Sequence, residues 1–171
     1  SLETVRFLLE NDAHINVTNY CGMNCNTLVY AALYSNDTSS LETVQLLLDH
    51  GADVNLQDKS SMTALMFSSK YSNNISSLET VQLLLNHGAD VSIKNNAGLT
   101  ALMFIIKNSN NVSSLDTIQL LLEKGADINA KDYKGFSALM FAVKYSNYAS
   151  SLETIQLLLE KDANVYVRDY N

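Results

Sequence analysis

One stretch of sequence recurs five times along this chain of 171 residues. SSLETVQLLLDHGAD, residues 39–53, returns as SSLETVQLLLNHGAD from residue 76 and as SSLDTIQLLLEKGAD from residue 113, with related copies near both ends. The Ser-Leu pairs begin at residues 1, 40, 77, 114 and 151, so their spacings are 39, 37, 37 and 37 residues. A fixed period in this range predicts stacked repeats, in which each unit packs mainly against its neighbours.

Each repeat is predicted to contain two helices. TALMFSSKYS, residues 63–72, has apolar residues at helical spacing and returns at residues 100–109 and 137–146. A polar loop follows, and the repeated stretch then supplies a second helix with Leu41, Val44, Leu47 and Leu48 on one apolar face. One helix pair cannot bury both of its faces, so the stability of each pair must come from stacking on the next pair.

The second helix has start and stop signals. Ser39 and Glu42 match the S-x-x-E capping box, and the same pattern returns at residues 76 and 79, 113 and 116, and 150 and 153. The glycines at 51, 88 and 125 follow the apolar run where a left-handed residue ends a helix. Asp12 and Asp162 stand at the equivalent positions and are expected to cost some left-handed strain.

The order of the elements resembles the ankyrin repeat over the whole chain: a helix, a loop and a second helix are followed by GADVN and by a D-x-x-G-like turn before T-x-L. LETVQLLLDHGADVNLQD, residues 41–58, carries the most specific part of the match. The resemblance implies an all-α ankyrin-repeat solenoid of stacked helix-loop-helix units with short β-hairpin-like fingers. The family period is about 33 residues, and the four extra residues here lie between the two helices. The longer unit resembles the ankyrin arrays of large DNA viruses.

The whole chain, residues 1–171, is expected to form a single array. The boundaries are a half repeat at 1–18, complete repeats at 19–57, 58–94, 95–131 and 132–168, and the start of a further repeat at 169–171. Arrays need polar capping repeats at their ends, and neither end of this sequence has one. We therefore expect the chain to be a piece of a longer array.

Composition limits the classes of function. The net charge of −7 argues against nucleic-acid binding by simple electrostatics. Two cysteines suit a reducing compartment, and no apolar run approaches the roughly 18 residues of a membrane span. These features predict a monomeric cytoplasmic protein without membrane contact, in the host cytoplasm if the source is a virus.

The sequence offers little chemistry. Cys21, Cys25 and His14 are the weak candidates for a metal site, but the C-x3-C spacing lacks a second ligand pair. His50 and His87 share one repeat position near a helix C-terminus, where the helix dipole and solvent favour histidine. No glycine-rich phosphate loop and no nucleophile–base set occurs. We expect no catalysis, no cofactor and no metal.

Charge is sorted by position in the repeat. The second helices and their Gly-Ala-Asp ends carry 14 of the 18 acids, whereas the fingers and first helices carry seven of the nine lysines. The stack should therefore be acidic on its outer side and mildly basic on its inner face. The ankyrin resemblance implies that partners contact the fingers and the ends of the first helices, which line the concave side. The expected contact residues are Lys59, Met62, Lys70, Tyr71, Asn96, Leu99, Lys107, Tyr133, Lys134, Phe136, Lys144 and Tyr145.

The expected function is that of a protein–protein interaction module and scaffold, whose partner protein carries an acidic or mixed patch. Exposed Tyr, Phe and Met beside Lys form the kind of surface that anchors an interface. Two alternatives stay open: a structural spacer within a larger multi-repeat protein, and nucleic-acid binding through the lysine columns, which the net charge disfavours. The lengthened loops at residues 36–39, 73–76, 110–113 and 147–150 are a second candidate edge for contact.

Overall fold

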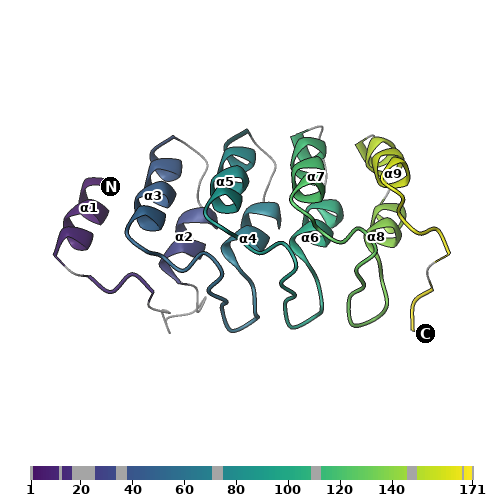
Figure 1. Cartoon of the computed structure of the whole chain (residues 1–171), viewed down its shortest axis with the longest axis horizontal. Coiled ribbons are helices and arrows are strands. Elements are labelled where there is room, and N and C mark those ends of the chain that lie inside the picture. Colours follow the sequence, from purple (N-terminus) through teal and green to yellow (C-terminus); the bar gives the residue numbers. More distant parts are fainter. Residues whose placement is uncertain are drawn as a thin grey trace.

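The computed structural model describes residues 2–11, 13–16, 26–33, 38–70, 75–108, 113–145, 150–166 and 168–170. Over these residues the chain forms nine helices and no strand (Figure 1). The helices are α1 (Leu2–Glu10), α2 (Thr27–Leu33), α3 (Thr38–Asp49), α4 (Ala64–Lys70), α5 (Ile75–Asn86), α6 (Ala101–Lys107), α7 (Ser113–Glu123), α8 (Ala138–Lys144) and α9 (Ser150–Glu160).

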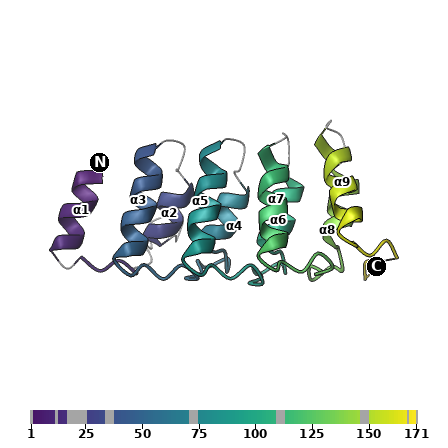
Figure 2. The same cartoon turned by 45° about the horizontal axis from the view of Figure 1, so that its top comes forward.

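The helices form two rows. The shorter helices α2, α4, α6 and α8 make the inner row, and α1, α3, α5, α7 and α9 stand side by side in the outer row (Figure 2). Each inner helix packs on the outer helix that follows it, and α4 also packs between α2 and α6. The predicted all-α repeat solenoid is confirmed. No helix in the part of the chain that the structure describes is long and apolar enough to cross a membrane.

Each inner helix starts at a side-chain cap. A short polar side chain accepts a hydrogen bond from the backbone N–H three residues later, which satisfies one of the unpaired donors of the first turn. The four capping residues are Asn26, Thr63, Thr100 and Ser137, with oxygen–nitrogen distances of 2.8, 3.3, 3.4 and 3.4 Å.

The starts of the outer helices differ from the sequence prediction. Ser39 and Ser76 lie second in α3 and α5, and Ser113 and Ser150 are the first residues of α7 and α9. All four serines are therefore inside the helix rather than at its cap, so the predicted cap position is wrong.

The predicted ends of the outer helices are correct. Gly51, Gly88 and Gly125 have φ of 83°, 84° and 89°, and Asp162 takes the same left-handed conformation with φ of 61°. The amide that follows each of them donates to a carbonyl five residues earlier, as Ala52 does to Leu47 at 3.0 Å. Asp12 lies outside the described residues.

The core lies between the two rows of helices. Of the predicted apolar face, Val44, Leu47 and Leu48 of α3 are buried at 0 %, 1 % and 7 % exposed, whereas Leu41 is only half-buried. The equivalent residues of α5 and α7, and the Ala-Leu pairs that open α4 and α6, continue the core without a break along the stack. Each repeat therefore supplies one layer of a continuous apolar core, and its two remaining surfaces are the fingers and the outer helices.

Candidate binding surfaces

The fingers are tight turns built on one polar side chain. In residues 58–62 the Asp58 carboxylate accepts hydrogen bonds from the amides of Ser60 and Met62, both at 2.8 Å, and the Asp58 amide donates back to the Met62 carbonyl at 3.0 Å. Asn95 and Asp132 make the same bonds in the next two fingers. A hairpin-like loop is thereby closed without a strand, since an Asp or Asn side chain can replace a backbone partner.

Successive fingers are joined by hydrogen bonds that repeat at about one period. The Asn96 amide donates to the Ser60 carbonyl at 3.0 Å, Tyr133 donates to Ala97 at 3.1 Å, and Tyr170 donates to the Lys134 carbonyl at 3.0 Å. Lysine side chains add to this edge: Lys94 Nζ donates to the carbonyl of residue 131 at 2.8 Å, and Lys131 Nζ to that of residue 168 at 3.1 Å. The described fingers are thus held in a fixed row.

A second row of bonds joins the Gly-Ala-Asp ends. Asn55 Oδ1 accepts from the Asp90 amide at 2.8 Å, and Asn55 Nδ2 donates to the Gly88 carbonyl at 3.2 Å. Asn16 makes both corresponding bonds at the joint before, to Gly51 and Asp53, and at the last joint Asn129 accepts from the Asn164 amide at 2.8 Å. Ser92 stands at the equivalent position of the remaining joint.

Ser92 bonds within its own repeat. Its hydroxyl donates to the Asp90 carboxylate at 2.6 Å, and its amide donates to the same carboxylate at 2.8 Å. These two hydrogen bonds hold the pKa of Asp90 below the ordinary 3.8, and the bond from the Ser92 hydroxyl has the larger effect. The shorter side chain therefore leaves the joint to the next repeat without the asparagine bridge.

Lysines and aromatic rings gather on the finger side of the last two complete repeats. Lys107 Nζ of α6 lies 5.8 Å from the ring centre of Tyr145, and Lys144 Nζ lies 5.9 Å from the same ring and 4.9 Å from that of Phe136. Phe141 links the two aromatic rings, with centroid distances of 5.5 Å to Phe136 and 6.3 Å to Tyr145. We call Lys107, Phe136, Lys144 and Tyr145 the finger-face cluster.

Other expected contact residues form the row of fingers itself. The Asn96 side chain bonds the Lys59 carbonyl at 3.0 Å and the Ser61 hydroxyl at 2.6 Å, so it locks two fingers together. Tyr133 is 65 % exposed and lies against Gly98, and Lys134 is exposed. Lys59 is exposed and Lys70 is half-buried in the earlier repeats, apart from the finger-face cluster.

Two of the expected contact residues are not on the surface. Met62 is 7 % exposed and Leu99 is 9 % exposed, so the expectation that they face a partner is wrong. Both are the last residue of a finger, and the turn directs this position toward the core, where Met62 Sδ also accepts a weak hydrogen bond from Asn95 Nδ2 at 3.7 Å. Phe136, at the same position in the next repeat, is half-buried.

The candidates for metal binding are not brought together by the described structure. Cys21 and Cys25 lie outside the described residues, as do Tyr71 and most of the lengthened loops. His14 is exposed. Across the described ranges, no three His, Cys, Asp or Glu side chains are placed to share a metal ion.

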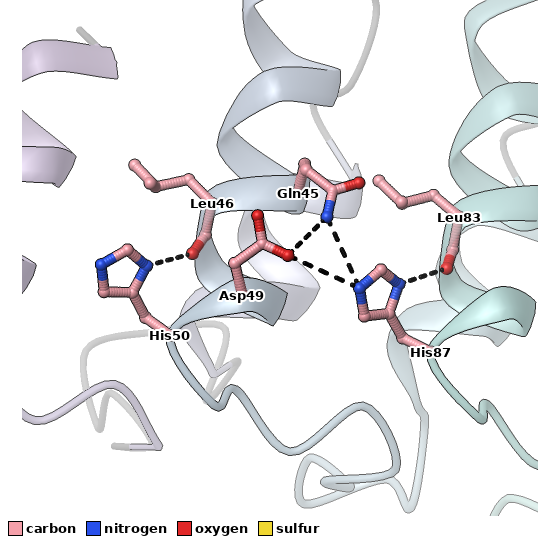
Figure 3. A network of polar contacts seen from close by, with 6 residues as sticks. All are labelled: Gln45, Leu46, Asp49, His50, Leu83 and His87. Carbon is pink, nitrogen blue, oxygen red and sulfur yellow. Dashed lines mark hydrogen bonds and ion pairs between the residues drawn. The ribbon is translucent and has the colours of Figure 1, made fainter.

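His50 and His87 end two neighbouring outer helices in the same way (Figure 3). The Nδ1 atom of each ring lies 2.8 or 3.0 Å from the carbonyl four residues earlier, so Nδ1 carries the proton that is donated. In the neutral ring His87 Nε2 is then an acceptor, 3.5 Å from Gln45 Nε2, while Gln45 also donates to Asp49 at 2.6 Å. This small network links α3 to α5 and places Asp49 3.7 Å from His87 Nε2.

The sequence reasoning missed a groove on the outer helices. It runs across α1, α3, α5 and α7, and its walls come from the same positions of successive repeats. The signal in the sequence is the column of acids at residues 42, 79 and 116, which recurs at the period of the repeat and has leucines beside it.

The chain is similar to known repeat proteins. A family model described as ankyrin repeats (3 copies) matches residues 1–95 and 65–169. A protein of Acanthamoeba polyphaga mimivirus that is named as an ankyrin repeat protein is 38 % identical over 65 residues, which is 34 % of this chain. The matched part spans 11 % of that relative's length.

Proposed function

Because this chain belongs to the ankyrin-repeat family, whose members are generally protein–protein interaction modules and typically non-catalytic, we propose that it binds a partner protein through its finger face. The finger face comprises the three described fingers, residues 58–62, 95–99 and 132–136, and the C-terminal ends of the inner helices. Recognition would take place on a preformed surface, without a covalent step.

The observation that carries this proposal is the finger-face cluster. Tyr145 is 36 % exposed and has a lysine ammonium within 6 Å from each of two repeats. A tyrosine offers a large apolar contact area together with a polar hydroxyl, and residues of this type supply much of the binding free energy at protein interfaces. The two lysines favour a partner surface with carboxylates, which would pair with the ammonium groups while an apolar side chain packs on the ring.

The row of fingers supports the proposal because it keeps the surface in one conformation. Asn96 and the backbone bonds of Tyr133 and Tyr170 join each described finger to the next. A surface that is ordered before binding loses less conformational entropy when the partner arrives. Lys59, Lys70, Tyr133 and Lys134 would extend the contact along the row.

The surroundings of this interaction follow from composition. The low cysteine content suits the reducing cytoplasm, and for a viral source this would be the cytoplasm of the host. The net charge of −7 opposes self-association, so we place the protein as a monomer in its free state.

The test compares two variants that differ only in the face they change. The finger-face variant carries Lys107→Gln, Lys144→Gln and Tyr145→Ser, which removes the exposed groups of the cluster and leaves the half-buried Phe136 in place. The chains would be immobilised, exposed to host-cell lysate and analysed by mass spectrometry after circular dichroism has shown equal folding.

The control variant carries Lys124→Gln, Lys161→Gln and Tyr166→Ser, the same three changes at exposed positions after the outer helices. A partner retained by the native chain and by the control, but lost from the finger-face variant, would support the proposal. With the purified partner, we expect the finger-face substitutions to raise Kd about tenfold or more. A partner lost equally from both variants, or retained by both, would refute binding through the finger face.

A further inference from the structure

The groove on the outer helices has a floor of leucines. Its volume is about 970 Å³, and it crosses four outer helices that stand side by side (Figure 2). The half-buried leucines that line it, beside Leu2 of α1, are Leu41, Leu46, Leu78, Leu83 and Leu120. A cavity of roughly 150 Å³ is enough for one benzene-sized group, so this groove has room for several apolar side chains in a row.

Carboxylates stand along this floor. Glu42, Glu79 and Asp116 occupy one repeat position on three successive helices, and all three are exposed and line the groove. In the described part of the chain, no lysine or arginine lies within ion-pair distance of any of them. Asp49 adds a fourth carboxylate, and Arg6 is the one basic residue among the described residues that line the groove. The groove therefore combines apolar area with unbalanced negative charge.

The walls of the groove determine the backbone conformation of an occupant. They are the sides of α-helices, whose backbone N–H and C=O groups are already paired along their length. An extended peptide lying over leucines would leave its own backbone groups without partners, which is costly away from water. A helix satisfies its own backbone groups, and an amphipathic helix can place residues i, i+3, i+4 and i+7 in an apolar groove.

The length of the groove sets the length of the occupant. Packed helices lie about 8–10 Å apart, so a groove across four of them is about 25–30 Å long. At about 1.5 Å per residue, this length corresponds to a helix of about 18 residues.

We propose that the outer groove binds an amphipathic helix of another protein, with an apolar face flanked by lysines or arginines that pair with Glu42, Glu79 and Asp116. This site is on the opposite side of the stack from the finger face and stands independently of the function proposed there. The protein would then carry two faces of opposite charge, one for an acidic partner surface and one for a basic helix.

The probe that tests this proposal is a fluorescein-labelled peptide of about 18 residues, made of leucine and lysine, with leucines at i, i+3, i+4 and i+7 so that it forms one apolar face. A second peptide has the same composition in an order that forms no apolar face. Binding to the native chain is measured by fluorescence anisotropy at about 50 mM salt, where exposed charges are only partly screened.

The groove variant carries Glu42→Gln, Glu79→Gln and Asp116→Asn. These exposed, nearly isosteric changes remove three charges and leave the leucine floor and the core unchanged. We expect the amphipathic peptide to bind the native chain at least tenfold more tightly than the scrambled peptide, and the groove variant to bind it about tenfold more weakly.

The matched control carries Asp127→Asn, Glu153→Gln and Glu160→Gln. Glu153 and Glu160 lie on α9 at the repeat positions of Glu79 and Asp49, outside the groove, so the control loses the same net charge. We expect its affinity for the peptide to change less than twofold.

Three results would overturn the proposal. Equal weakening in the groove variant and in the control would show that only the overall charge attracts the peptide. Equal binding of both peptides would show that the leucine floor plays no part. A dimer of the native chain that the groove substitutions dissociate, measured by light scattering, would make a second copy of the chain the occupant instead.

Discussion

Ser92 breaks the row of asparagine bridges between repeats, and Ser92→Asn should complete it. At the preceding joint Asn55 accepts from the Asp90 amide at 2.8 Å and donates to the Gly88 carbonyl at 3.2 Å. One period later the equivalent groups are the Asp127 amide and the Gly125 carbonyl, which an asparagine at position 92 can reach in the same way.

The expected gain follows from counting hydrogen bonds. Each bond between exposed groups contributes about 0.5–1 kcal/mol net, at the lower part of the usual range. The substitution forms two bonds and removes one, the bond from the Ser92 hydroxyl to Asp90. The expected net gain is about 0.5–1 kcal/mol in the free energy of unfolding, and Tm should rise by about 1–4 °C for a chain of this size.

The assay is thermal and urea unfolding followed by circular dichroism at pH 7. Asn55→Ser is the reciprocal control, which removes two bonds and permits one, and should lower stability by a similar amount. If Asn55→Ser destabilises the chain but Ser92→Asn does not stabilise it, position 92 is not equivalent to position 55. If neither changes Tm, the bridges do not stabilise the stack and the reasoning fails.

Four further outcomes are expected. Asp162→Gly should raise stability by about 0.5–1 kcal/mol in urea unfolding because it relieves a left-handed residue, φ 61°, whose carboxylate makes no hydrogen bond among the described contacts; no change would show that the strain is absent. Gly98→Ala should destabilise by about 2 kcal/mol or more, since its φ is 80° and the new Cβ would lie 2.6 Å from the Tyr133 amide nitrogen; a loss of only about 1 kcal/mol would mean that the fingers move apart easily. Thr117→Val should leave stability unchanged or raise it by about 1 kcal/mol, because the buried hydroxyl has no partner within the described structure; a clear loss would reveal one. Ser92→Ala should raise the pKa of Asp90 toward 3.8 in a carboxyl NMR titration. A lowered pKa in the folded state stabilises the fold above pH 3.8, and this stabilisation is lost as the pH falls through the folded-state pKa. The variant should therefore lose less stability in acid than the native chain.

The fold could be predicted because its rules are local and are repeated. The 37-residue period, the apolar face of the second helix and the glycine stops each depend on residues close in sequence, and every copy confirms the others. Asp162 could be assigned left-handed backbone for the same reason, by its alignment with Gly125.

The parts that the sequence did not predict depend on side-chain direction and on several repeats together. Met62 and Leu99 were expected on the surface because each belongs to a finger, but the turn points that residue into the core. The groove is formed by four helices, and each leucine alone looks like an ordinary core residue. The missing bridge at Ser92 could have been found by aligning residue 92 with Asn16, Asn55 and Asn129, because serine has a shorter side chain than asparagine.

The bonds between neighbouring fingers also determine how the stack can bend. Directional hydrogen bonds hold the spacing along the fingers and along the Gly-Ala-Asp ends of the outer helices, whereas the half-buried leucines farther along the outer helices make non-directional contacts. A bending motion should therefore pivot about this hydrogen-bonded side and change the spacing between the opposite ends of the outer helices. The fingers would keep their spacing when the stack bends, and the outer groove would change its width to fit its occupant.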